Sequence, residues 1–200
     1  EYGFSGFKLY PPLGYFPFDQ RLDEVYAYAE SRGIPLTTHC SRAGPFVYWR
    51  GKITKEMRRH PKTGKPLAGD GRRSFADNWA NPASYAYVLE AHPGLKLNLA
   101  HAGGEIEWRK FLFTTWPSKL PGQRSVIGGR DTWLEAVIDL IRRYSNVYAD
   151  ISYTAYDVKL LPLLKVLLAD QLLGERFLFG SDSYMVQMEA CERQFGIGVR

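Results

Sequence analysis

Three apolar segments of the sequence each end on a residue type that binds metal ions or exchanges protons. They are Ile34–His39, Leu95–His101 and Phe177–Asp182. Imidazole nitrogens and carboxylate oxygens are donors that zinc and similar divalent ions use in proteins. Histidine also gains or loses a proton close to neutral pH. The ends of these segments therefore indicate metal-assisted or acid–base chemistry.

Each of the three segments has the length and composition of a buried parallel strand, and each follows a stretch with helical spacing. In a βα barrel the carboxyl ends of the strands converge on one face, where active sites lie. We therefore expect His39, His101 and Asp182 to lie close together in space. Because adjacent side chains on a strand point to opposite faces, Cys40 is expected to be buried against the helices.

Predicted strands and helices alternate along the whole sequence. The strands are 6–10, 34–39, 95–101, 146–152 and 177–182, and the helices are 19–32, 81–92, 131–144 and 157–173. Strict alternation predicts a parallel sheet with right-handed crossovers. The expected fold class is α/β, with about five βα units in one domain over residues 1–200. Asp131 is expected to cap the third helix, and residues 41–80 show no clear period.

Length and composition narrow the class of protein. A chain of 200 residues is short for a complete eight-stranded βα barrel, which typically needs about 250. No apolar run approaches the roughly 20 residues of a membrane-spanning helix. The two cysteines, Cys40 and Cys191, make no disulfide framework, so we expect a cytoplasmic protein. The sequence begins at Glu1 without an initiator methionine, and we expect both ends to be parts of a longer chain.

Positive charge is concentrated in one segment. Residues 42–77 contain ten Lys or Arg and three Asp or Glu, a net charge of +7, whereas the whole chain carries +5. This pattern indicates a basic insertion at about residues 42–80 on a scaffold whose remainder carries −2. Our first interpretation is a solvated surface insertion, and our second is a lid whose Arg72 or Arg73 binds an anionic substrate.

Nucleic-acid binding is a distant third interpretation of this basic insertion, because aromatic residues are sparse in it and no nucleic-acid motif appears. We therefore expect the partner to be a small-molecule substrate, and neither a nucleic acid nor a membrane. The sequence is also compatible with a homo-oligomer.

Five sequence blocks carry a family resemblance. They are Gly6–Pro11, Pro35–Ser41, Leu97–Gly104, Asn146–Ser152 and Leu178–Asp182. In this order they resemble strands four to eight of the barrel in the amidohydrolase superfamily, specifically the amidohydrolase-2 family. That family includes metal-dependent hydrolases and non-oxidative decarboxylases such as aminocarboxymuconate-semialdehyde decarboxylase. The resemblance implies the C-terminal portion of a TIM (β/α)8 barrel.

The resemblance also implies roles for the residues at the strand ends. His39 would be the fifth-strand metal ligand and Asp182 the eighth-strand ligand, which would also take a proton from the attacking water. His101 would be the sixth-strand histidine, acting as acid or base beside the metal or binding the metal itself. The cofactor implied is a divalent metal, most commonly zinc, with manganese as the alternative.

Residues on the first and fourth predicted strands are weaker candidates for the pocket. Lys8 and Tyr10 share one face of their strand and could both bind substrate. Lys8 has two other interpretations, a packed and paired lysine or a carboxylated metal ligand of the kind some amidohydrolases carry. Asp150, Ser152 and Tyr153 could line the pocket at the end of the fourth strand.

Two histidines remain outside these blocks. His60 and His92 are expected at the surface. None of the four histidines forms the His-x-His pair that the family's first strand supplies to the metal.

Three functions follow from these observations. The first is a metal-dependent hydrolase that activates water to attack an ester, lactone or amide of a small anionic substrate. The second is a decarboxylase, a carbon–carbon lyase that uses the same site. The third is a catalytically silent fragment or interaction module, whose exposed edge strands at 6–10 and 177–181 would pair with another chain.

Overall fold

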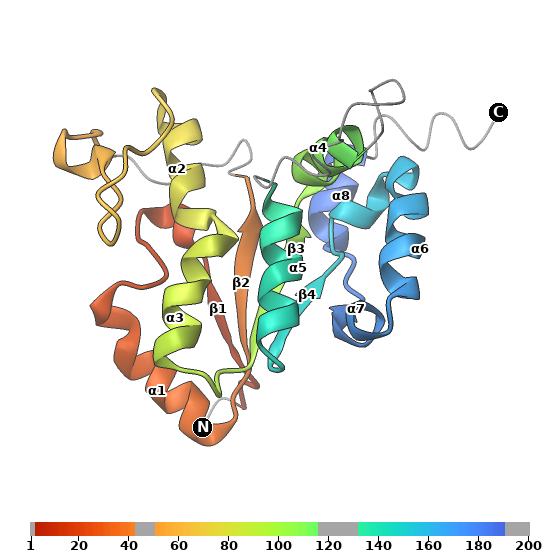
Figure 1. Ribbon diagram of the computed structural model, residues 1–200, viewed down its shortest axis with the longest axis horizontal. Coiled ribbons are helices and arrows are strands. Elements are labelled where there is room, and N and C mark those ends of the chain that lie inside the picture. The colour runs from red at the N-terminus through yellow and green to blue at the C-terminus, as the bar shows by residue number, and fades with distance from the viewer. Residues whose placement is uncertain (1–2, 43–50, 116–131, 191–200) are drawn as a thin grey trace, which may run out of the picture.

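The computed structural model describes residues 3–42, 51–115 and 132–190. These residues form a five-stranded parallel sheet whose strands follow one another in chain order (Figure 1). The strands are β1 (Phe7–Leu9), β2 (Leu36–Ser41), β3 (Leu97–Gly103), β4 (Val147–Asp150) and β5 (Phe177–Leu178). Pairing of each strand with the next one along the chain is the arrangement of consecutive βα units in a barrel. The predicted α/β class, as part of a barrel, is confirmed.

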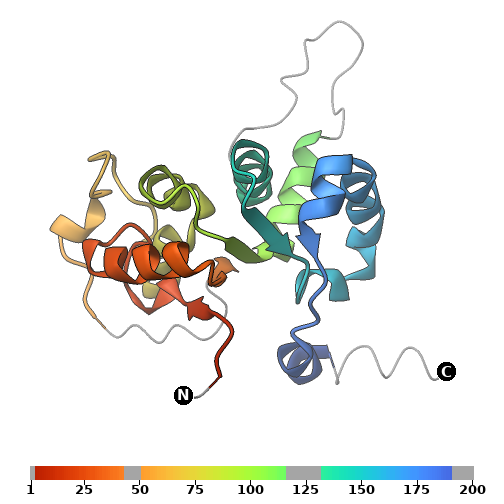
Figure 2. The same ribbon diagram turned by 90° about the horizontal axis from the view of Figure 1, so that it is seen from below.

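Helices follow every strand, and α1, α3, α5 and α6 lie on one side of the sheet (Figure 2). The α-helices are α1 (Asp23–Arg32), α2 (Arg72–Ala80), α3 (Tyr85–Ala91), α4 (Glu105–Thr115), α5 (Trp133–Arg143), α6 (Leu161–Ala169), α7 (Gln171–Arg176) and α8 (Ser183–Ala190). Short 3-10 turns occupy Pro11–Leu13, Gln20–Leu22, Glu56–Arg58, Pro82–Ser84, Thr154–Tyr156 and Val158–Leu160.

The two faces of the sheet differ in burial. Along β2, Leu36, Thr38 and Cys40 are fully buried, whereas the residues between them are only partly buried. The buried face packs against the helices in one core, in which Leu36, Leu97 and Val147 lie at the same level of neighbouring strands. The expected burial of Cys40 is confirmed. The opposite face carries His39 and remains available for chemistry.

Several element limits differ from those predicted. The helix predicted at 157–173 is two helices, because Asp170 leaves the helical conformation and its side chain caps α7 by accepting from the Leu173 amide at 3.1 Å. Asp131 lies outside the described residues. Thr132 caps α5 instead, in a reciprocal arrangement with Glu135.

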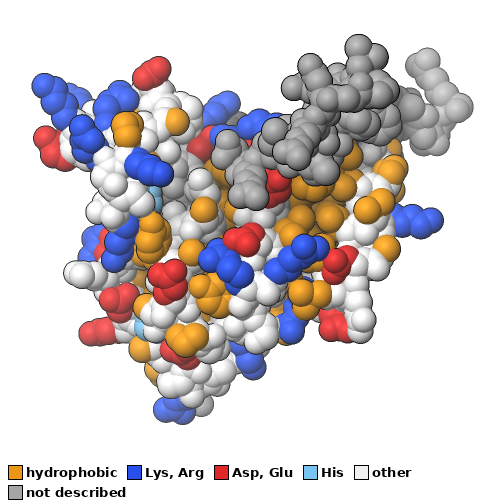
Figure 3. Space-filling model, viewed as in Figure 1, with side chains coloured by type: hydrophobic (Ala, Val, Ile, Leu, Met, Phe, Trp, Pro, Cys, Tyr) orange, Lys and Arg blue, Asp and Glu red, His pale blue; other side chains and the backbone are white. Residues whose placement is uncertain are grey.

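The described part of the basic insertion contains regular structure, although its sequence shows no clear helical or strand period. Its helix α2 buries Phe75, Ala76 and Trp79 in a small second core. The sequence shows no clear period because the apolar residues that pack against this core, Ile53, Met57 and Leu67, are scattered along the insertion. Figure 3 shows Lys and Arg side chains grouped around this corner of the molecule.

Neither of the two histidines predicted at the surface is fully exposed. The ring of His60 lies 5.3 Å from that of Phe16 and 5.2 Å from that of Phe18, which holds the insertion against the segment after β1. His92 packs against Tyr26, with ring centroids 5.6 Å apart, and its Nδ1 lies 3.3 Å from a carboxylate oxygen of Glu30. His92 lies before the amino end of β3, whereas His60 packs on the segment that follows β1.

The strands at the two edges of the sheet expose apolar side chains. Phe4 and Phe179, beside β1 and β5, are 88% and 87% exposed. Val166 and Leu168 are also exposed on α6, where Figure 3 shows hydrophobic side chains gathered. None of the described helices is long and apolar enough to cross a membrane.

Candidate active site

The structure brings together two of the three predicted strand-end ligands. The ring centroids of His39 and His101 are 4.9 Å apart, and the ring of Tyr10 lies 4.5 Å from that of His39. These residues come from β2, β3 and the end of β1, which are neighbours in the sheet. His101 is 8% exposed. Two histidines and a tyrosine therefore form one cluster at the carboxyl ends of the strands.

Regular strand geometry does not explain how the ring of His101 reaches His39. His39 lies opposite Ala100 in the sheet register, so an ideal β3 would point His101 to the other face. The backbone of His101 instead has φ 70°, and the left-handed conformation continues through Ala102, Gly103 and Gly104. This turn places the imidazole beside His39.

Left-handed backbone at residues other than glycine is concentrated in this region. In the described ranges it occurs at His101, Ala102, Tyr153 and Asp182, which lie at the carboxyl ends of β3, β4 and β5. Each such residue costs about 1–2 kcal/mol relative to ordinary helical backbone. Strained backbone of this kind occurs preferentially at functional sites. The strain therefore marks the same face as the histidine cluster.

Gly104→Ala is expected to lower the free energy of unfolding by about 2–4 kcal/mol. Gly104 has φ 82°, and a Cβ there would lie 2.7 Å from the Cβ of Ser41. Ser41 would have to move, and its Oγ is hydrogen-bonded to Nε2 of His39 at 3.0 Å. Urea unfolding measures the loss. Gly64→Ala is the control, because Gly64 is also left-handed but has no atom near its Cβ. A loss no larger than that of the control would contradict the packing argument.

His101 is surrounded by residues of the segment after β4. Its Nδ1 lies 3.0 Å from the carbonyl oxygen and 3.0 Å from Oγ of Ser152. Its amide donates to Oδ1 of Asp150 at 3.0 Å, and Thr154 Oγ1 donates to its carbonyl at 2.8 Å. Asp150 and Ser152, weak candidates from the sequence, thus contact the central histidine.

Asp150 is a buried carboxylate that remains charged. Burial alone would raise its pKa, but hydrogen bonds from Ser152, the His101 amide and Asn98 outweigh burial and lower it. Asn98 Nδ2 donates to its Oδ2 at 2.8 Å. A fixed negative charge therefore lies directly behind His101.

Both histidines of the cluster are neutral at physiological pH. Burial, with smaller contributions from His101 and Lys8, lowers the pKa of His39 to about 3. Burial also lowers the pKa of His101, although its hydrogen bond to Ser152 and the charge of Asp150 act in the opposite direction. Neutral imidazole is the form that binds a metal or accepts a proton.

The metal-free protein is expected to lose stability as pH falls below about 6.5, the ordinary pKa of histidine. Unfolded His39 would take up a proton near that pH, whereas folded His39 does so only near 3. Between these values the unfolded state binds more protons, so the free energy of unfolding decreases with decreasing pH. Urea unfolding with a chelator present, from about pH 8 to about pH 5, measures this slope. His39→Gln should make the slope shallower, and an equal slope in the variant would contradict the assignment.

Lys8 and Asp182 lie within electrostatic range of this cluster. Loss of hydration lowers the pKa of Lys8, and the negative charges of Asp150 and Asp182 partly oppose that shift. The charge of Asp182 also acts on His101. Asp182 immediately precedes α8, and its carbonyl accepts from the amide of Met185 at 2.9 Å.

The fit of this cluster to a divalent metal is partial. Across residues 3–42, 51–115 and 132–190, no group of three or more His, Cys, Asp or Glu side chains is arranged to hold a metal ion. Catalytic zinc sites use three protein ligands. His39 and His101 therefore fit two adjacent positions of such a site, without completing it.

Arg72 and Arg73 are exposed in the first turn of α2, and the described structure shows no contact between them and either histidine of the cluster. Arg42, which sequence reasoning did not single out, lies closer to β2. It pairs with Asp77 at 3.0 Å and with Glu107 at 2.6 Å. Its position directly after β2 and at the start of the basic insertion was the available signal.

Glu107 connects the elements behind the histidine cluster. Its side chain is fully buried, and it accepts hydrogen bonds from Lys110 at 2.8 Å and from the Trp133 amide at 2.9 Å as well as from Arg42. Burial would raise its pKa, but these three donors lower it. The Arg42 guanidinium also stacks 5.1 Å from the Trp133 ring. One carboxylate thus joins β2, α4 and α5.

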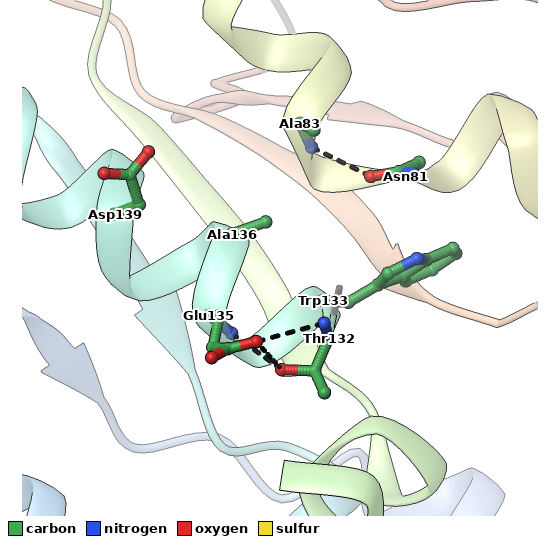
Figure 4. A pocket seen from close by; sticks show the side chains of 7 residues that line it. All are labelled: Asn81, Ala83, Thr132, Trp133, Glu135, Ala136 and Asp139. Carbon is green, nitrogen blue, oxygen red and sulfur yellow. Dashed lines mark hydrogen bonds between the residues drawn. The ribbon is translucent and has the colours of Figure 1, made fainter. Parts of the chain in front are cut away.

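A cavity of about 690 Å³ lies beside this network, between the start of α5 and the turn before α3 (Figure 4). Its lining residues are Asn81, Ala83, Thr132, Trp133, Glu135, Ala136 and Asp139. Neither histidine of the cluster lines it. Glu135 is engaged in capping α5, as the dashed lines in Figure 4 show.

The fold and the strand-end residues define a class, a βα-barrel protein with histidines at the carboxyl ends of its strands. The Amidohydrolase family model (Amidohydro_2) matches residues 1–197. The chain therefore belongs to the amidohydrolase family, which includes hydrolases and decarboxylases and generally uses a divalent metal.

Comparison with solved structures agrees on the fold. The chain is similar to an uncharacterized TIM-barrel protein from Bordetella bronchiseptica, with 18% identity and a TM-score of 0.51 over 97% of this chain and 50% of that one. A 2,6-dihydroxybenzoate decarboxylase complexed with 2,6-dihydroxybenzoate is 15% identical, with a TM-score of 0.40 over 93% and 51%. The chain spans about half the length of the solved structures it matches. No curated protein matches it.

Proposed function

We propose that this chain is the strand-four-to-eight portion of a metal-dependent hydrolase that attacks an ester, lactone or amide of a small anionic substrate. The observation that carries the proposal is the pair of neutral imidazoles, His39 and His101, placed 4.9 Å apart by strained backbone at the strand ends. Family membership supports a metal-dependent reaction. Beyond family membership, we propose the class of substrate, the metal and the type of reaction.

His39 and His101 would hold the metal, with Asp182 approaching from the end of β5. A divalent ion in such a site lowers the pKa of a bound water and polarises the substrate oxygen. Zinc is the first choice, because imidazole and carboxylate suit it, and manganese is the second. The ligands that complete the site would come from barrel strands that match none of the five sequence blocks.

The chain's own residues move protons and orient the substrate. Asp182 accepts a proton from the attacking water. A neutral imidazole has one lone pair, so His101 either binds the metal or, where other residues complete the metal site, takes up a proton at the reacting group. Tyr10, packed on the His39 ring, and Lys8, close to Asp150 and Asp182, lie where they can bind the substrate. The positive charge of Lys8 interacts with both of these carboxylates and suits an anionic group of the substrate.

A decarboxylase is the second candidate, because the same pair of histidines and the same carboxylates serve both reactions and the family contains both kinds of enzyme. Here His101 would first take up a proton from water at its free ring nitrogen and then deliver it to the carbon that loses the carboxylate. The two candidates share their residues, so only the products separate them.

Product analysis on the full-length protein tests the proposal. The protein, loaded with zinc or manganese, is incubated with esters, lactones and amides of small carboxylic acids, and with aromatic carboxylic acids. Hydrolysis without bicarbonate release supports the hydrolase, and bicarbonate release supports the decarboxylase.

An Arg72→Ala, Arg73→Ala variant in the same panel tests whether these two residues of the basic insertion form a lid that binds an anionic substrate. If Arg72 and Arg73 form a lid, this variant should raise KM for anionic substrates only about two- to fivefold, since both residues are exposed. An unchanged KM would contradict the lid.

The third candidate, a silent fragment, has its support in the exposed edge strands β1 and β5. Exposed edges tend to pair with other chains. Metal-loaded protein that is inactive on the whole panel, and that forms oligomers through these edges, would favour it. A monodisperse monomer would argue against pairing through the edges.

A further inference from the structure

The hydrogen bonds around His101 identify which of its ring nitrogens carries the proton. The carbonyl oxygen of Ser152, 3.0 Å from Nδ1, can only accept. The hydroxyl of Ser152, also 3.0 Å from Nδ1, has one hydrogen, and that hydrogen is donated to Oδ1 of Asp150. Both contacts therefore require a proton on Nδ1. A neutral imidazole has only one N–H, so Nε2 has a free lone pair.

Asp150 holds this arrangement in place. Its Oδ1 accepts from the Ser152 hydroxyl, the Ser152 amide at 3.0 Å and the His101 amide at 3.0 Å. Its Oδ2 accepts from Asn98, whose own Oδ1 is buried without a hydrogen-bond partner in the described part of the chain. Rotating the Asn98 amide would turn that oxygen toward the carboxylate. The amide oxygen of Asn98 thus remains unsatisfied, while both carboxylate oxygens of Asp150 accept hydrogen bonds.

We propose that Asp150 and Ser152 are positioning residues that fix His101 in the Nδ1–H tautomer and present its Nε2 lone pair to the site. The carboxylate orients the hydroxyl, and the hydroxyl and the adjacent carbonyl together orient the ring. The inference deepens the proposed function, on which the role of the Nε2 atom rests. The tautomer itself rests on hydrogen-bond geometry alone.

The tautomer assigns an order of events to His101. In the resting site its Nε2 can bind a metal or accept a proton, and it has no proton to donate there. When Nε2 accepts a proton, Nδ1–H still donates to Ser152, and the Asp150 carboxylate lies one hydroxyl away from the positive ring. A carboxylate behind a histidine acts in this way in catalytic triads, where the two groups touch directly. Here a serine hydroxyl lies between them.

The test is nitrogen-15 NMR of histidine-labelled protein, without substrate or metal. The chain has only four histidines, and the spectrum of His101→Gln identifies the His101 signals. The expected wild-type result is a protonated Nδ1 and an unprotonated Nε2 at neutral pH. In Asp150→Ala the Ser152 hydroxyl loses its acceptor and is free to donate to Nδ1, so the Nε2–H tautomer should appear. Asp157→Ala is the matched control, because Asp157 is equally buried, at 8% exposure, but pairs with Arg109.

Two results would overturn the inference. One is a wild-type Nε2 that carries the proton. The other is an Asp150→Ala spectrum identical to those of wild type and Asp157→Ala. If Asp150→Ala does not fold, a pair of Ser152 variants decides the positioning role. Ser152→Ala should lower kcat about tenfold and Ser152→Thr should restore it, with Nδ1 protonated in both, and equal kcat values in the two would count against the proposal.

The two proposals fail separately. The expected tautomer in a protein that turns over nothing would end the proposed function and leave the positioning role intact. Full activity in a protein whose His101 carries its proton on Nε2 would end the positioning role and leave the proposed function intact.

Discussion

Replacing His101 with glutamine is expected to lower kcat about 10²–10⁴-fold on whichever substrate the full-length protein turns over. His101 lies in the left-handed turn at the end of β3. It donates hydrogen bonds to Asp150 and Ser152 and accepts one from Thr154. Glutamine keeps a polar group of similar size but cannot exchange a proton near neutral pH. Steady-state kinetics measure the loss, and thermal unfolding shows whether the variant is folded.

His92→Gln is the matched control for this prediction. His92 lies at the end of α3 that precedes β3, where it contacts Glu30 and Tyr26. The amino ends of the strands are remote from the proposed chemistry, so kcat should stay close to that of wild type. A His101→Gln enzyme that kept most of its activity would remove His101 from the catalytic machinery.

Replacing Glu107 with alanine is expected to lower the free energy of unfolding by about 3 kcal/mol, the lower end of what breaking a buried ion pair costs. Glu107 is fully buried, whereas the Arg42 side chain remains 32% exposed, so water compensates part of the lost pairing. Alanine also leaves the Trp133 amide without its acceptor. Urea unfolding measures the difference.

Glu105→Ala is the control on the same helix. Glu105 pairs with the half-exposed Arg109 at 2.8 Å, and such pairs contribute about 0.2–1 kcal/mol. Glu107→Gln separates charge from hydrogen bonding, because glutamine can still accept from the Trp133 amide. Equal losses for the alanine variants at 105 and 107 would show that Glu107 is not the link between β2, α4 and α5.

The sequence predicted the order of elements because strand and helix periods differ strongly in this chain. The alternation of side chains along β2 was predicted correctly: Cys40 points to the helices, and its neighbour His39 points to the opposite face. The parallel order of the sheet followed from the alternation of strand and helix. The adjacency of His39 and His101 followed in turn from their places at the ends of neighbouring strands.

The details of the site could not be read from periodicity. Alternation on β3 would point His101 away from His39, and only the left-handed backbone at positions 101 and 102 reverses it. Neither position is glycine, and the Gly103–Gly104 pair, which does signal a turn, comes only after His101. The contact between Arg42 and Glu107 joins residues 65 positions apart, and the one between His101 and Ser152 joins residues 51 apart. Such pairs form only when strands and helices pack.

The division between α6 and α7 has a similar origin. The segment is apolar throughout, and a helical period continues through Asp170, which predicted one helix. Asp170 is an efficient helix N-cap. Its extended backbone ends α6, and its side chain accepts from the Leu173 amide at the start of α7. A capping residue within an apolar run was the available signal.

Metal content of the natively purified protein tests the central claim most directly. Wild type should carry about one zinc or manganese ion per chain, as expected for a site with one catalytic metal. His39→Gln and His101→Gln should each lose most of it, whereas His92→Gln should retain it. Wild-type protein that contains no metal, and takes up none on titration with zinc or manganese, would contradict the claim that these strand ends form part of a metal-dependent active site.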